Sequence, residues 1–146
     1  MSTFLFRAPT SRSVSLGLAV LRIGAAIVFM NHGYQKVFGW GFAGVSGAFG
    51  HMGVPLPGVM GPLIAVLEFF GGIALLLGFL TRPLGFFFAC DMLGAILLVR
   101  LKDGFGKFEL EFLLLVAAIT VVLTGAGAYS VDAMIARRSE GVNRPL

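Results

Sequence analysis

The chain has 146 residues, of which 58% are hydrophobic and only 12% are charged, and its net charge is +4. Soluble domains contain about 25% charged residues, so the composition indicates a membrane protein and argues against a soluble enzyme. The basic residues flank hydrophobic runs and do not form one face, which excludes nucleic acid as a partner and favours the lipid bilayer. The single cysteine, Cys90, excludes an internal disulfide and a redox pair of cysteines.

Four apolar stretches follow one another, each close to the roughly 20 residues that a bilayer crossing requires. The first covers about residues 14–38, after a polar and basic leading segment. The other three cover about residues 62–80, 84–101 and 108–124. Little chain is left over, so we predict one membrane domain over residues 1–146. Its predicted fold is all-α: an antiparallel bundle of four transmembrane helices.

A connector of about residues 39–61, rich in Gly and Pro, joins the first two predicted helices. It is too apolar for a solvated loop, so we expect a short element on or in the membrane surface that covers one end of the bundle. Pro62 is well placed to begin the second helix, because proline is tolerated in the first turn.

The orientation follows from the lysine and arginine count on each side of the membrane. The side with both termini holds Arg7, Arg12, Arg82, Arg137, Arg138 and Arg144. The opposite side holds Lys36, Arg100, Lys102 and Lys107. The excess predicts that both termini are cytoplasmic.

Two ionisable residues lie deep in predicted helices, on the side of the termini. A charge at mid-bilayer costs roughly 2.5–3.5 kcal/mol, so such side chains are expected to face the bundle interior and find partners. At about 1.5 Å per residue, Arg22 and Asp91 lie at similar depths of roughly 12 and 10 Å. We therefore predict that Arg22 and Asp91 share an ion pair or a hydrogen-bond network. A contact between Arg22 and Glu68 is the alternative.

A second group lies toward the opposite side. His32 and Lys36 are one helical turn apart and share a stripe, and Glu68 and Glu111 lie near the outer ends of their helices. We predict that these four side chains converge, with Tyr34, Gln35 and Arg100 nearby. Such a group forms either a polar pocket or proton path, or charged pairs that only fix helix register.

Cofactor signals are weak in this sequence. His32, His51 and the carboxylates do not have the spacing of metal ligands, so no metal site is predicted, and no motif supports a nucleotide or a covalent cofactor. A haem held by His32 is a minor alternative.

An ordered set of motifs covers nearly the whole chain: Leu21-Arg22, His32-Gly33-x-x-Lys36, Gly53-Val54-Pro55, Glu68-x-x-Gly71-Gly72, Gly78-x-x-Thr81-Arg82, Glu111 and Gly127-x-x-Ser130-x-Asp132. This order resembles the DoxX family of small four-helix bacterial membrane proteins. Relatives in that family include a membrane subunit of a thiosulfate:quinone oxidoreductase and a membrane partner of superoxide dismutase and a sulfurtransferase. The resemblance implies a bacterial inner-membrane protein linked to quinone or thiol redox chemistry.

These features predict a membrane subunit of a redox system whose polar interior binds a quinone or a small redox metabolite. The electrons have to come from a protein partner that carries a redox cofactor, because the chain shows no cofactor motif of its own. A non-catalytic membrane anchor or assembly factor is the second hypothesis. A small transporter is the third, and four short helices would have to oligomerise to form one. The sequence does not decide whether the chain is itself an enzyme.

Overall fold

The structure, a computed structural model, describes residues 8–142, and every regular element in that range is a helix. In chain order these are α1 (Ser11–Tyr34), the π-helical η1 (Gln35–Trp40), α2 (Gly41–His51), α3 (Pro57–Val66), the π-helical η2 (Leu67–Gly71), α4 (Gly72–Leu77), α5 (Thr81–Gly94), the π-helical η3 (Ala95–Arg100), the 3-10 turns η4 (Leu101–Asp103) and η5 (Phe105–Lys107), α6 (Glu109–Thr124) and α7 (Val131–Val142). The predicted all-α fold is confirmed. Arg7 and Arg144, which contributed to the predicted orientation, lie outside the described residues.

Three helices are long and apolar enough to cross a membrane: one beginning with α1, one from Pro57 to Leu77 and one from Thr81 to Asp103. Large apolar side chains cover the outer surface, among them Val20 at 72% and Leu123 at 73% exposed, as expected for a protein surrounded by lipid. The 16 residues of α6 span about 24 Å, less than the roughly 30 Å hydrocarbon core. A four-helix bundle therefore stays a prediction.

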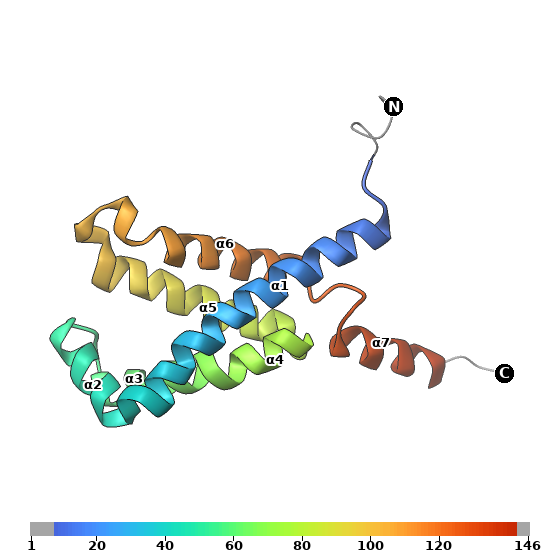
Figure 1. The fold of residues 1–146 in the computed structure, drawn as a ribbon. Coiled ribbons are helices and arrows are strands. Elements are labelled where there is room, and N and C mark those ends of the chain that lie inside the picture. The colour runs from blue at the N-terminus through green and yellow to red at the C-terminus, as the bar shows by residue number, and fades with distance from the viewer. Residues whose placement is uncertain (1–7, 143–146) are drawn as a thin grey trace.

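The connector is a helical hairpin. The first long helix ends at Gly41, whose φ of +67° suits a residue without a Cβ, and α2 turns away from it there (Figure 1). α2 then packs against α3, and Val45 of α2 is fully buried. Pro57 occupies the first turn of α3, so the placement of Pro62 at the helix start was wrong. Pro57 already satisfies the preference for proline at that position, and Pro62 lies inside the helix.

The core lies between α1, α4, α5 and α6. The buried rings of Phe29 and Phe88 are stacked, with centroids 3.9 Å apart. Glycines permit the close approach of the helices around them: a Cβ on Gly72 would overlap the side chain of Met30. Lipid chains are as apolar as these side chains, so the hydrophobic effect does not drive the helices together in a membrane. Close packing of this kind holds them together instead.

Figure 1 shows that the start of α1, the α4–α5 turn and α7 lie at one end of the molecule, here called the terminal end. α2 and the α5–α6 connection lie at the other, the hairpin end. Asp132 ties the terminal end together. Its carboxylate accepts hydrogen bonds from the backbone N–H groups of Leu80 and Thr81, each at 2.9 Å. Its own N–H donates to the Gly78 carbonyl at 2.9 Å, so the first turn of α7 caps the start of α5.

Candidate functional site

Arg22 is buried near the terminal end, and its partners are backbone carbonyls. Nη1 donates to the carbonyl oxygen of Ala126 at 2.8 Å, and Nη2 donates to that of Tyr129 at 2.9 Å. Both acceptors lie in the α6–α7 loop. Backbone carbonyls in a loop lack the partners that a helix provides and have to be satisfied elsewhere, and Arg22 supplies donors to two of them. The acid that acts on it electrostatically is Asp132.

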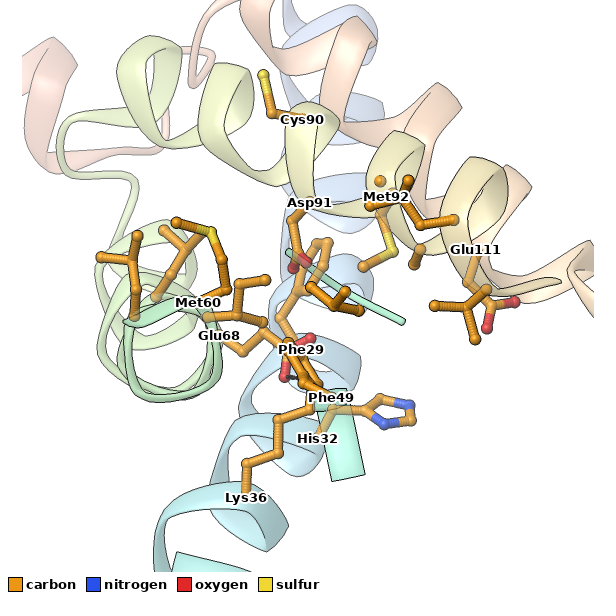
Figure 2. Close-up of a pocket in the computed structure, with 18 of the residues that line it drawn as sticks. Phe29, His32, Lys36, Phe49, Met60, Glu68, Cys90, Asp91, Met92 and Glu111 are labelled. Carbon is orange, nitrogen blue, oxygen red and sulfur yellow. Dashed lines mark hydrogen bonds and ion pairs between the residues drawn. The ribbon is translucent and has the colours of Figure 1, made fainter. Parts of the chain in front are cut away.

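The predicted pairing of Arg22 with Asp91 is therefore wrong, and the alternative pairing with Glu68 is not formed either. Counting residues from each helix start predicted similar depths for Arg22 and Asp91, but Arg22 lies beside Gly78 at the α4–α5 turn, whereas Asp91 lies near Glu68 and Lys36. The position of a residue along its own helix also does not say in which direction its side chain extends. Arg22 extends toward the α6–α7 loop, whereas Asp91 faces a cavity closer to the hairpin end (Figure 2).

That cavity has a volume of about 740 Å³ and is lined by the long helices together with α2 and the turn after it. Most of its wall is apolar, with Phe29 as one of the larger contributors. Five of the six predicted site residues line it: His32, Lys36, Glu68, Asp91 and Glu111. Arg22 does not, and Tyr34 and Gln35 are exposed on the outside. The structure thus brings the predicted outer group together and adds Asp91 to it.

The centre of the polar group is an ion pair between Lys36 and Glu68. The Nζ of Lys36 lies 2.5 Å from Oε2 of Glu68, and the two side chains are 16% and 4% exposed. Gly33 makes this contact possible, because a Cβ at that position would overlap the backbone of Phe69. α1 and η2 therefore touch at Gly33, one turn before Lys36.

Asp91 extends from α5 toward Glu68 (Figure 2). The Asp91 carboxyl group is close enough to Lys36 to interact with it electrostatically, and close enough to Glu68 to share a hydrogen bond with it when one of the two acids is protonated. Its Oδ2 is buried and has no hydrogen-bond partner among the described residues. A buried acceptor without a donor is costly and rare in folded proteins. This oxygen therefore marks a position at which a ligand could place a hydrogen-bond donor.

Glu111 forms the opposite edge of the polar group. Its Oε1 lies 3.8 Å from Nε of Arg100, and the side chains are 22% and 48% exposed, respectively. A pair this open contributes little to stability. His32 lies between this edge and the Lys36–Glu68 pair, with its ring on the side nearer to Glu111 (Figure 2).

Three π-helical segments surround the cavity, and the sequence did not predict them. η1 carries Lys36, η2 carries Glu68, and η3 begins four residues after Asp91 and carries Arg100. A π-helical turn contains more residues than an α-helical one, which changes the direction of the side chains that follow, and such turns are frequent at functional sites. No hydrophobic periodicity marks them, because these helices are apolar on nearly every side.

The donor set suits a hydrogen-bonded ligand better than a metal ion. Within residues 8–142, no group of three or more His, Cys, Asp or Glu side chains is arranged to hold a metal. The carboxylates of Glu68 and Glu111 each lie beside a cation, Lys36 and Arg100. The arrangement offers charged donors and one free acceptor, surrounded by apolar wall.

Comparison with known proteins identifies related sequences. The family model DoxX matches residues 17–101, a stretch that includes most of α1, the elements from η1 to η3 and all the cavity residues named above except Glu111. No solved structure matches the chain significantly.

Three bacterial proteins are similar over most of their lengths. "Putative oxidoreductase CatD" of Bacillus subtilis is 34% identical over 135 residues, which cover 91% of this chain and 97% of that protein. "Inner membrane protein YqjF" of Escherichia coli is 36% identical over 127 residues, or 84% and 95% of the two chains. "Inner membrane protein YphA", also of Escherichia coli, is 29% identical over 124 residues, or 79% and 87%.

Proposed function

Since this chain belongs to the DoxX family, we propose that it is the membrane subunit of a redox system and binds a quinone in its cavity. The observation that carries the proposal is the Lys36–Glu68 pair beside the unpartnered Oδ2 of Asp91, inside an apolar cavity of about 740 Å³. Ligand sites typically have volumes of about 300–1,000 Å³ and apolar walls with a few convergent polar groups.

The residues fit the two oxidation states of such a ligand. A quinone takes up two electrons and two protons to give a quinol, with one proton on each ring oxygen, and a partner protein with a redox cofactor would supply the electrons. The ammonium of Lys36 and the ring N–H of His32 can donate hydrogen bonds to a ring carbonyl. The free oxygen of Asp91 can accept a hydrogen bond from a ring hydroxyl, and the carboxyl groups of Asp91 and Glu68 can hold the protons that are exchanged.

The proposal also covers the membrane in which this subunit lies, its orientation and its partner protein. We place it in the bacterial inner membrane, where the names of YqjF and YphA place those relatives. Both termini are on the cytoplasmic side, and α6 with its preceding turn is the fourth helix of the bundle. A redox protein docks on it, because no cofactor motif is present in the chain.

Trp40, the one tryptophan of the sequence, lines the cavity and provides a test, because quinones quench indole fluorescence. Titration of the purified protein with a short-chain benzoquinone should give saturable quenching. The double variant Lys36→Met/Glu68→Leu should weaken binding at least tenfold. It should keep its melting temperature, since a buried ion pair can often be replaced by apolar residues of similar volume without loss of stability.

The matched control is Lys107→Met/Glu109→Leu, which makes the same replacements at exposed positions outside the cavity and should bind like the wild type. Wild-type protein without saturable quenching would contradict the proposal. That result would favour the second candidate, a non-catalytic anchor or assembly factor. This candidate is supported by Arg22, whose bonds go only to backbone carbonyls and serve no pocket.

A further inference from the structure

Two stripes of apolar side chains face the cavity and the outside of the molecule at the same time. On α5 and η3 these are Phe87 and Leu98, 54% and 51% exposed, and on α3 they are Leu63 and Val66, 55% and 40% exposed. Half-exposed side chains that also line a cavity lie at its edge, where at most one layer of side chains separates the cavity from the outside. The cavity therefore has a side opening bordered by α3 on one side and by α5 and η3 on the other.

The packing of the helices leaves this opening free. The principal packing partners of α3 are α2, η2 and α1, whereas α5 packs mainly on α6. Gly94, which lines the cavity between Asp91 and Leu98, has open space where a Cβ would stand. The opening thus leads from the outer surface to within one helical turn of Asp91.

The surroundings of the opening decide what can pass through it. The exposed side chains that border the opening, Leu63, Val66, Phe87 and Leu98, are all apolar, so the opening faces lipid chains and not water. An apolar chain can stay there at little cost, because it exchanges lipid for apolar side chains. A polar ring on the same molecule gains hydrogen bonds at Asp91 and Lys36 that the bilayer does not offer.

We propose that the ligand enters sideways from the bilayer between α3 and α5–η3, and that it is a quinone with a long apolar chain. The ring reaches the Lys36–Asp91 region while the chain remains in the opening between Val66 and Leu98. This inference rests on the proposed function and adds to it the direction of entry and the class of ligand.

The test compares two quinones with the same ring, one with a long apolar chain and one without, on the full chain in lipid nanodiscs. Trp40 quenching measures both affinities. The portal variant Val66→Phe/Leu98→Phe should weaken binding of the chain-bearing quinone at least tenfold and leave that of the chainless quinone within twofold. The control variant Val59→Phe/Leu97→Phe enlarges equally exposed neighbours that do not line the cavity, and it should bind both quinones like the wild type.

A second variant tests the same opening independently, in case the first variant does not fold. Gly94→Leu places a side chain into open space beside the cavity and should also select against the chain-bearing quinone, whereas Gly24→Leu, at another helical glycine with open space, should change nothing. Equal effects on both quinones, or none on the chain-bearing one, would overturn sideways entry while leaving the proposed function intact. Wild-type protein that binds neither quinone would overturn both.

Discussion

Single charged residues play two different parts in this molecule. Arg22 and Asp132 act on backbone groups: the guanidinium holds the carbonyls of the α6–α7 loop, and the carboxylate caps the start of α5. Lys36, Glu68 and Asp91 instead face one another across a cavity. A charged side chain inside the membrane needs hydrogen-bonding or oppositely charged groups around it. Where these groups belong to the backbone, the charge stabilises the fold. Where they are side chains that line a cavity, they can also bind a ligand.

This division predicts how substitutions combine. Arg22→Ala removes two hydrogen bonds from a charged donor and should cost roughly 3 kcal/mol, measured by denaturant unfolding in detergent micelles. Combined with Asp91→Asn, the losses should add to within about 0.5 kcal/mol, because the two residues share no partner. Combined with Asp132→Asn, they should fall short of the sum, because both residues secure the α6–α7 junction. Arg12→Ala, at the exposed start of α1, is the control and should be neutral. Strong non-additivity between Arg22 and Asp91 would restore the pairing that the structure contradicts.

At the scale of elements, glycines and π-helical turns set the positions of the polar residues. Gly33 brings α1 against η2, and the π-helical segments lie where Lys36, Glu68 and Arg100 line the cavity. Gly72 similarly brings α4 against Met30 of α1. These glycines explain two of the motifs seen in the sequence: Gly33 lets α1 approach η2 next to the Lys36–Glu68 pair, and Gly72 lets α4 pack against Met30.

The contact at Gly33 can be tested within one helix. Gly33→Ala places a methyl group into the backbone of η2 and should destabilise the protein by roughly 1–3 kcal/mol, as well as weaken quinone binding by separating Lys36 from Glu68. Gly24→Ala, nine residues earlier and with no neighbour within 4 Å, should stabilise by up to about 1 kcal/mol through helix propensity. Thermal unfolding followed by circular dichroism measures both. Similar melting temperatures for the two variants would show that α1 and η2 do not need this close approach.

For the whole molecule, the two ends differ in character. The terminal end is tied by hydrogen bonds among α1, the α4–α5 turn and α7. The hairpin end, closed by α2 and the α5–α6 connection, is near the cavity. If α6 crosses the membrane, the start of α1 and the whole of α7 lie on one side of the bilayer and the α5–α6 connection lies on the other.

Cysteine labelling tests this topology. In a Cys90→Ser background, Lys102→Cys should react with a membrane-impermeant maleimide in intact spheroplasts. Arg12→Cys and Arg138→Cys should react only after the membrane is permeabilised. All three positions are exposed on the protein, so differences report the side of the membrane. Labelling of Arg138→Cys together with Lys102→Cys would show that α6 does not cross, and labelling of the Arg12 and Arg138 positions alone would reverse the orientation.

The sequence by itself determined the class of protein, its helical content and the group of residues to examine. These depend on local quantities: the hydropathy of a stretch of about 20 residues and the cost of a charge within it. It also predicted that His32, Lys36, Glu68 and Glu111 lie near one another, and in the structure all four line one cavity.

Only the tertiary structure decided which partners the charges have. Rise per residue gives the position of Arg22 and Asp91 along their own helices. It does not give the shift and rotation of neighbouring helices relative to one another, which set the level and the direction of each side chain. The π-helical turns alter this rotation, and the contact at Gly33 sets the separation of the helices. In a chain whose helices are apolar on nearly every face, no periodicity reveals such a rotation. Arg22 therefore turned out to secure the terminal end, while Asp91 joined the cavity that Lys36 and Glu68 define.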